Sequence, residues 1–136
     1  MNKKAEILMS HVIYTILVVL FTVGMFLVIA QQMNGAAVWE EFYAKEISRI
    51  INLAQPEDEI TLHIQKATEI AKDNEVRSFS EIFQFNNLEN EICVKLSQGR
   101  KTCYSYFNEV DVVEVELKLG VPENYLIFKI SEVKNE

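Results

Sequence analysis

The chain has 136 residues, of which 49% are hydrophobic, and its formal net charge is −7. This length corresponds to one domain, and only four glycines are available for phosphate-binding loops. From Asn34 onward, 11 basic and 19 acidic residues give a charge of −8, which argues against a nucleic-acid partner and against docking of this region on anionic lipid.

A long uncharged segment lies near the N-terminus. Residues 7–33 contain no Asp, Glu, Lys or Arg, and residues 12–30 are almost entirely apolar. A bilayer core is crossed by about 20 apolar residues, and a helix satisfies its own backbone groups in lipid. We therefore expect a transmembrane helix over residues 7–33. The alternative is a secretory signal peptide, which has a shorter apolar core and would here be cleaved near residues 35–37.

The charges that flank this segment predict its orientation. Lys3 and Lys4 precede the segment together with Glu6, whereas Glu40 and Glu41 are the first charges after it. The positive-inside rule therefore predicts that residues 1–6 lie in the cytoplasm and that the chain after the segment is extracytoplasmic.

Three polar residues within the segment, His11, Thr15 and Thr22, fall on one side of the expected helix, and Ser10 and Tyr14 lie beside them. Polar side chains in lipid-embedded helices often mark contacts between helices. His11, Thr15 and Thr22 are therefore candidates for an intramembrane contact. The alternative is that His11, which is near the cytoplasmic edge, faces lipid headgroups.

Residues 34–56 predict an amphipathic juxtamembrane helix that ends before a proline. Its apolar stripe comprises Ala36, Trp39, Tyr43, Ile47, Ile50 and Ala54. Its polar positions include Glu40, Glu41, Lys45 and Arg49. Trp39 and Tyr43 are candidates for the membrane interface, where aromatic residues gather. We favour the alternative that the stripe packs on the sheet of the domain itself, because a small sheet needs a cover.

Residues 57–136 are expected to form an extracytoplasmic α+β domain. A strand is predicted over residues 59–64, and a short helix over residues 65–74 places Ala67, Ile70 and Ala71 on one side. Further strands are predicted at residues 78–86, 91–97, 102–107, 112–119 and 125–131.

Alternation along the last two of these strands predicts which side chains are buried. The apolar face of residues 112–119 comprises Val113, Val115, Leu117 and Leu119. The apolar face of residues 125–131 comprises Leu126, Phe128 and Ile130. Such alternation, with a charged opposite face, is typical of a small antiparallel β-meander sheet that is covered on one side.

Two cysteines, Cys93 and Cys103, flank an expected turn around Gly99. With a loop of residues 97–99 the cysteines face each other, and Ile92 then opposes Tyr104 while Val94 opposes Thr102. Opposed residues bring the two Cβ atoms within reach of a disulfide, which an extracytoplasmic setting permits. We expect a structural Cys93–Cys103 disulfide. Two free thiols are the alternative, and the nine-residue spacing is unlike that of a zinc site.

The sequence lacks the G-x-S-x-G, H-E-x-x-H, Walker and dinucleotide-binding patterns. After the apolar segment the chain has one histidine, His63, within an expected strand, and the acidic turn at residues 57–59 lacks the spacing of an EF-hand loop. We expect no catalytic, cofactor or metal site. The expected function is that of a single-pass, membrane-anchored interaction or assembly module, whose partner binds the transmembrane helix or a sheet edge, or which associates with itself there.

The layout of the chain resembles that of type IV pilins. An apolar N-terminal helix continues into an amphipathic half, a sheet with a disulfide hairpin follows, and NKKAEILMSH supplies basic residues before Ala5. The resemblance implies an alternative function as a subunit or minor component of a surface filament. Pilins carry a glutamate as the fifth mature residue, whereas cleavage after Ala5 would place Ser10 there.

The segment GAAVWEEFYAKEISRIINLAQPEDEI, residues 35–60, is similar to part of short, uncharacterised single-pass membrane proteins of small-genome archaea. Those proteins have no assigned activity. This second resemblance implies a cell-surface setting and no particular reaction.

Overall fold

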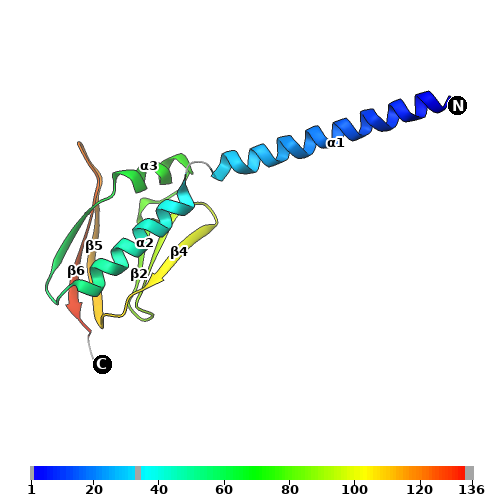
Figure 1. Ribbon diagram of the computed structural model, residues 1–136. Coiled ribbons are helices and arrows are strands. Elements are labelled where there is room, and N and C mark those ends of the chain that lie inside the picture. The colour runs from blue at the N-terminus through cyan, green and yellow to red at the C-terminus, as the bar shows by residue number, and fades with distance from the viewer. Residues whose placement is uncertain (1, 33–34, 134–136) are drawn as a thin grey trace. The chain divides into compact units, whose positions relative to one another are not determined.

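The chain divides into two compact units, Met1–Asn34 (unit 1) and Gly35–Glu136 (unit 2). The computed structural model describes residues 2–32 and 35–133. Residue 33, the expected end of the transmembrane helix, and residue 34, the expected start of the juxtamembrane helix, lie outside the described residues. Unit 1 contains one helix, α1 (Lys3–Gln32), drawn in blue in Figure 1.

α1 confirms an N-terminal helix that is long and apolar enough to cross a membrane. The segment Lys3–Ile29 meets this condition, and none of its most apolar window is buried within the protein. Its large apolar side chains are exposed around the whole circumference, as Phe21 (72%) and Val23 (51%) illustrate. A signal sequence near the N-terminus would meet the same condition. Apolar side chains on every face indicate an apolar environment, because water would oppose their exposure.

Within its described residues, 35–133, unit 2 holds two further α-helices, a 3₁₀ turn and six strands. They are α2 (Ala36–Leu53), β1 (Glu59–His63), α3 (Gln65–Asp73), η1 (Phe79–Glu81), β2 (Phe83–Asn86), β3 (Glu91–Ser97), β4 (Arg100–Ser105), β5 (Val110–Lys118) and β6 (Tyr125–Glu132). The α+β class is therefore confirmed. The predicted strand at residues 78–86 is wrong in its first half, where η1 forms.

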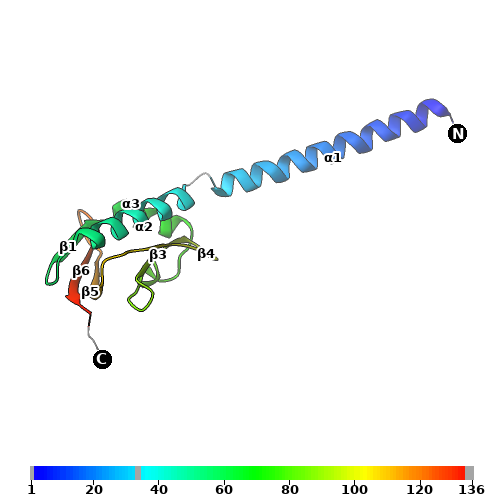
Figure 2. The same cartoon turned by 60° about the horizontal axis from the view of Figure 1, so that its bottom comes forward.

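The strands form two antiparallel sheets instead of the expected single meander. Their orders are β1-β6-β5 and β2-β3-β4. The hairpins between strands that are consecutive in the sequence agree with the local sequence pattern. The pairing of β1 with β6 joins strands far apart in the sequence, and no local pattern specifies it. α2 packs on β3 and β4, and α3 packs on β3. Figure 2 shows both helices on the same side of the strands.

The core lies between the two helices and the sheets. The apolar side of α2 is buried at Ala36, Tyr43, Ala44, Ile47 and Ile51. The favoured expectation, that α2 covers the domain's own sheet, is thus confirmed. At the end of the stripe, Ile51 is buried instead of the predicted Ile50. The predicted faces of α3 and β6 are confirmed, and their members are Ala67, Ile70, Ala71, Leu126, Phe128 and Ile130.

The predicted face of β5 is wrong before the bulge, at Val113, but holds after it at Leu117, which packs against the core. Val112 is buried, whereas Val115 is 43% exposed. A register shift between Val113 and Glu116 inserts one extra residue, and Glu114 within it has a positive φ of 51°. Because side chains alternate with a period of two, one inserted residue exchanges the two faces of the strand.

Candidate functional site

The β3–β4 hairpin carries the predicted disulfide. Cys93 and Cys103 are bonded, with their Cα atoms 4.0 Å apart. The predicted pairs Ile92–Tyr104 and Val94–Thr102 are also confirmed. The predicted three-residue loop is wrong, because Ser97 pairs with Arg100 across a two-residue turn, and a bulge between Val94 and Ser97 absorbs the difference in register.

A carboxylate lies against the disulfide. Glu91 Oε1 is 3.2 Å from Cys93 Sγ, a contact without a hydrogen because a disulfide sulfur carries none. Within the described residues, Glu91, Cys93 and Cys103 bring possible metal-ligating atoms within 4.8 Å of one another. Both sulfurs are used in the disulfide, so they offer no thiolate to a metal ion.

Glu40 was predicted on the polar side of its helix, but the structure places it in the core with no exposed surface. Its Oε1 accepts hydrogen bonds from the Leu96 backbone N–H at 2.9 Å and the Ser97 hydroxyl at 3.3 Å. Its Oε2 accepts one from the Thr102 hydroxyl at 3.1 Å and lies 3.7 Å from Arg100 Nε. These four donors match the capacity of a carboxylate.

The position of Glu40 explains the bulge in β3. Leu96 lies inside the register shift, so its N–H has no place in the regular ladder, and Glu40 accepts it instead. One buried side chain on α2 thereby fixes the geometry of the β3–β4 turn. A sequence signal existed: Ala36 and Ala44, each one turn away, are small residues on the same face.

The predicted membrane-interface residues have different surroundings. Tyr43 is 5% exposed, and its ring meets that of Phe83 edge to face within the core. This burial raises the pKa of the Tyr43 phenol. Tyr43 is therefore unavailable to lipid headgroups. Trp39 is partly buried, and its ring contacts that of Phe42, which is 52% exposed.

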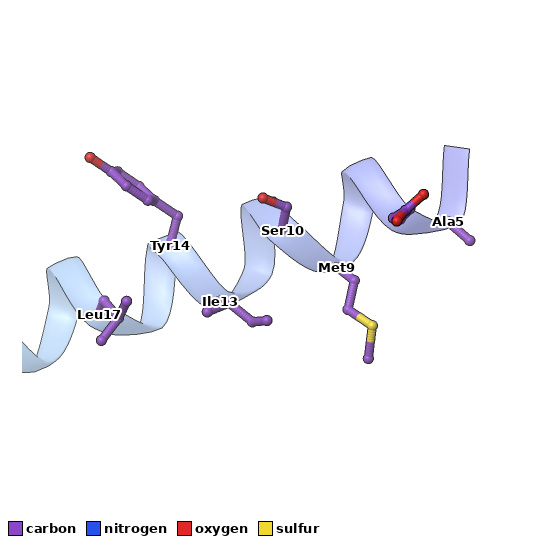
Figure 3. Close-up of a pocket in the computed structure, with 7 residues that line it drawn as sticks. Ala5, Met9, Ser10, Ile13, Tyr14 and Leu17 are labelled. Atoms are coloured by element: carbon purple, nitrogen blue, oxygen red, sulfur yellow. The ribbon is translucent and has the colours of Figure 1, made fainter. Parts of the chain in front are cut away.

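The polar residues of α1 are partly satisfied within the helix. The hydroxyl of Thr15 donates to the His11 carbonyl at 2.9 Å, and that of Thr22 donates to the Val18 carbonyl at 2.7 Å. These hydroxyls do not require a partner helix, and an intramembrane contact through His11, Thr15 and Thr22 stays a prediction. A shallow hollow along the first half of α1 is lined by side chains of α1 alone (Figure 3).

His63 lies at the end of β1 and is half exposed. Its Nε2 is 3.4 Å from Glu123 Oε2, and the Tyr125 hydroxyl donates to the same carboxylate oxygen at 2.7 Å. The hydrogen bond to Glu123 raises the pKa of Tyr125. In the expected acidic turn, the Asp58 carboxylate accepts the Gln55 N–H at 2.7 Å, so this group shapes the turn.

An apolar groove lies between the two sheets. β2 is an edge strand of one sheet and β5 an edge strand of the other. The groove has a volume of about 420 Å³. Its lining residues are Phe79, Ser80, Phe83, Phe85, Val112, Val115 and Leu117. Six of these seven side chains are apolar, so the groove suits a partner that brings apolar side chains.

The edge of β5 is paired at Val112 with a side-chain amide. The Val112 N–H donates to Asn87 Oδ1 at 2.9 Å, and Asn87 Nδ2 donates to the Val112 carbonyl at 3.0 Å. The Tyr106 hydroxyl donates to the same Asn87 oxygen at 3.3 Å. Asn87 thus pairs with the edge of β5 at one residue, and the edge continues beyond it toward Lys118.

Comparison of the chain with protein-family models, with curated proteins and with solved structures finds no match. The resemblances to type IV pilins and to short archaeal membrane proteins therefore stay predictions. The apolar helix α1 and the groove of unit 2 are the features of the protein that bear on its function.

Proposed function

We propose that this protein is a single-pass membrane protein whose extracytoplasmic domain is a non-catalytic interaction module. In this proposal α1 is the anchor, and the groove between β2 and β5 binds an extended segment of a partner protein. The observation that carries the proposal is the groove itself, because it joins an apolar cleft to an open strand edge.

An extended segment fits both features of the groove. A strand that adds to a sheet edge gains backbone hydrogen bonds, and its alternate side chains enter the neighbouring pockets. The edge of β5 after Val112 can supply the backbone hydrogen bonds. The side chains of Phe79, Phe85 and Leu117 form the pockets. The partner segment is then expected to be uncharged at alternate positions.

Two features support the proposed orientation, with residues 1–6 in the cytoplasm and unit 2 outside. Lys3 and Lys4 precede α1, as the positive-inside rule requires of a cytoplasmic end. The Cys93–Cys103 disulfide in unit 2 belongs with an oxidising compartment.

Peptide selection tests the groove. The full chain in lipid nanodiscs would be screened with a displayed library of extended peptides, and the affinities of selected peptides measured by fluorescence anisotropy. Val115→Lys places a charge in the groove and is expected to weaken binding about tenfold or more, since a buried unpaired charge is costly. Leu119→Lys is the matched control, because Leu119 is similarly exposed at 48% but does not line the groove.

Selected peptides that bind both variants alike would place the interaction elsewhere on the protein. A library that yields no binder above an unrelated disulfide-bonded domain would count against an interaction module of this kind.

A separate experiment tests the anchor and its orientation. Protease added to intact cells is expected to digest unit 2 and spare the N-terminus, and membranes are expected to keep the chain after alkaline extraction. The mass of the mature N-terminus distinguishes the alternatives, because a terminus at Glu6 would indicate pilin-like processing and a terminus near Ala37 a cleaved signal peptide.

A further inference from the structure

Exposed apolar side chains lie on one side of the first two turns of α2. Val38 is 69% exposed and Phe42 is 52% exposed, and the Phe42 ring meets the Trp39 ring edge to face at a centroid distance of 5.4 Å. We call Val38, Trp39 and Phe42 the interfacial patch. Its residues are consecutive or one turn apart, so they form one continuous surface.

Val38 and Phe42 face away from the core, whereas Trp39 packs partly against it. Glu40 points into the core, and Val38 and Phe42 each lie two positions from it, a rotation of about 200° around a helix. Their exposure means that no described part of unit 2 covers them. A surface that is apolar and uncovered requires an occupant outside unit 2.

Few residues separate the patch from the end of α1 along the chain. Six peptide steps separate Gln32, where α1 ends, from Val38. Since a chain extends at most about 3.5 Å per residue, this connection is at most roughly 21 Å long. If α1 spans a bilayer, the polar headgroup layer, about 6 Å thick on each side, is within this reach.

The charges at this end of unit 2 are compatible with a lipid surface. Arg100 Nε lies 3.7 Å from Glu40, which places the β3–β4 turn beside the start of α2, as Figure 1 shows. The side chain of Arg100 is 62% exposed, and Lys101 is also exposed. The net charge of −8 predicts repulsion from anionic lipid for the domain as a whole, but these two cations lie at the end that carries the patch.

We propose that the interfacial patch inserts into the headgroup layer of the bilayer that holds α1. The inference rests on the proposed membrane anchor, and it adds a second lipid contact made by the folded domain. Aromatic side chains prefer this layer, and an amphipathic helix lies there through its apolar face. The driving force is apolar, so the contact is expected on zwitterionic lipid and does not need anionic headgroups.

Trp39 is the single tryptophan of the chain, so its fluorescence reports on the patch alone. The full chain would be reconstituted in phosphatidylcholine vesicles that carry a spin label at the headgroup, at a shallow acyl position or at a deep acyl position. We expect the two shallow labels to quench Trp39 and the deep label to quench it weakly. The paired substitution Val38→Ser with Phe42→Ser is expected to reduce shallow quenching about threefold or more, because it removes most of the inserted apolar area.

Phe107→Ser is the matched control, since Phe107 is 88% exposed and lies in the connection after β4. This variant is expected to leave the quenching unchanged. Adding phosphatidylglycerol is expected to matter little for the native chain and to lower shallow quenching in Lys101→Glu, whose added negative charge anionic lipid repels.

Retention of the chain in the vesicles after alkaline extraction is measured in the same samples. A retained chain without shallow quenching overturns the inference and leaves the anchor intact, whereas a chain that is not retained overturns the anchor and the inference together. Quenching that rises as protein is diluted in lipid would mean that a second copy covers the patch at higher protein density, and would also overturn the inference.

Discussion

Glu40 is a carboxylate with no exposed surface inside unit 2. It holds α2 to the β3–β4 hairpin because it accepts hydrogen bonds from Leu96, Ser97 and Thr102. A buried donor without an acceptor is unfavourable, because it has lost its hydrogen bonds to water and gained none in the protein. The arrangement therefore depends on the Glu40 carboxylate. Helical periodicity alone places Glu40 at the margin of the apolar stripe, and the hairpin that it meets is far away in the sequence.

Glu40→Ala is expected to lower the free energy of unfolding by about 3 kcal/mol, since it leaves several buried donors without partners. The neighbouring Glu41→Ala is the control, and it should leave the urea midpoint nearly unchanged because Glu41 makes an exposed ion pair with Lys45. Urea unfolding of the full chain in detergent, followed by Trp39 fluorescence, measures both. Equal losses for the two variants would contradict the role assigned to Glu40.

Burial of Tyr43 predicts a loss of stability at alkaline pH. Burial raises the pKa of Tyr43 above its usual value near 10, so the folded protein keeps the phenol protonated while the unfolded chain releases its proton. The stabilisation is fully present below about pH 10 and is lost as pH rises. Between pH 9 and 11 the urea midpoint should fall less for Tyr43→Phe than for the native chain. Tyr14→Phe, a change outside unit 2, should follow the native chain, and an unchanged fall in Tyr43→Phe would refute the prediction.

At the scale of elements, two β-bulges decide which side chains the strands bury. The bulge in β3 lies where Glu40 replaces a ladder acceptor, and the bulge in β5 lies at Glu114. The bulge in β5 brings Val112 to the core side and leaves Val115 in the groove. The candidate binding site therefore depends on an irregularity that alternation could not reveal.

The backbone at Glu114 predicts a preference between two substitutions. A positive φ costs about 1–2 kcal/mol for a residue with a side chain, and glycine avoids this cost. Glu114→Gly should therefore be more stable than Glu114→Val by about 1–2 kcal/mol. Both variants lose the ion pair with Lys129, so the comparison isolates the backbone. Equal urea midpoints for the two would contradict the bulge conformation.

The disulfide is the other element-level constraint, because it joins adjacent strands β3 and β4. Replacing Cys93 and Cys103 together by serine is expected to lower the free energy of unfolding by about 2–3 kcal/mol, as for a short closed loop. Reductant should have the same effect on the native chain and none on the double variant. A native midpoint that reductant leaves unchanged would show that the bond contributes little.

At the scale of the whole molecule, the chain combines two units with opposite solvent requirements. α1 exposes apolar side chains on every face, whereas unit 2 encloses its own core. The buried core residues all lie between Ala36 and Ile130. The stability of unit 2 is thus expected to be independent of α1.

Removing residues 1–34 tests this independence. The shortened chain is expected to be soluble without detergent and to unfold within about 0.5 kcal/mol of the full chain, because no core residue is lost. The full chain without detergent is expected to aggregate. A shortened chain without cooperative unfolding would mean that α1 contributes to the fold of unit 2.

The sequence by itself determined the features that arise from neighbouring residues. The apolar helix, the amphipathic helix before Pro56, the short helix that contains Ile70, the hairpin disulfide and the buried face around Phe128 all follow from local composition and period. Each requires information from a short segment, which is why its residues could be named in advance.

Only the tertiary structure decided how these segments combine. The pairing of β1 with β6, the division into two sheets, the burial of Glu40 and the faces of β5 each depend on residues distant in sequence. Periodicity indicates only which side chains tend to be buried. It does not indicate which distant segment packs against them. The groove between β2 and β5 exists because two such distant partners meet, and for that reason no local pattern predicted it.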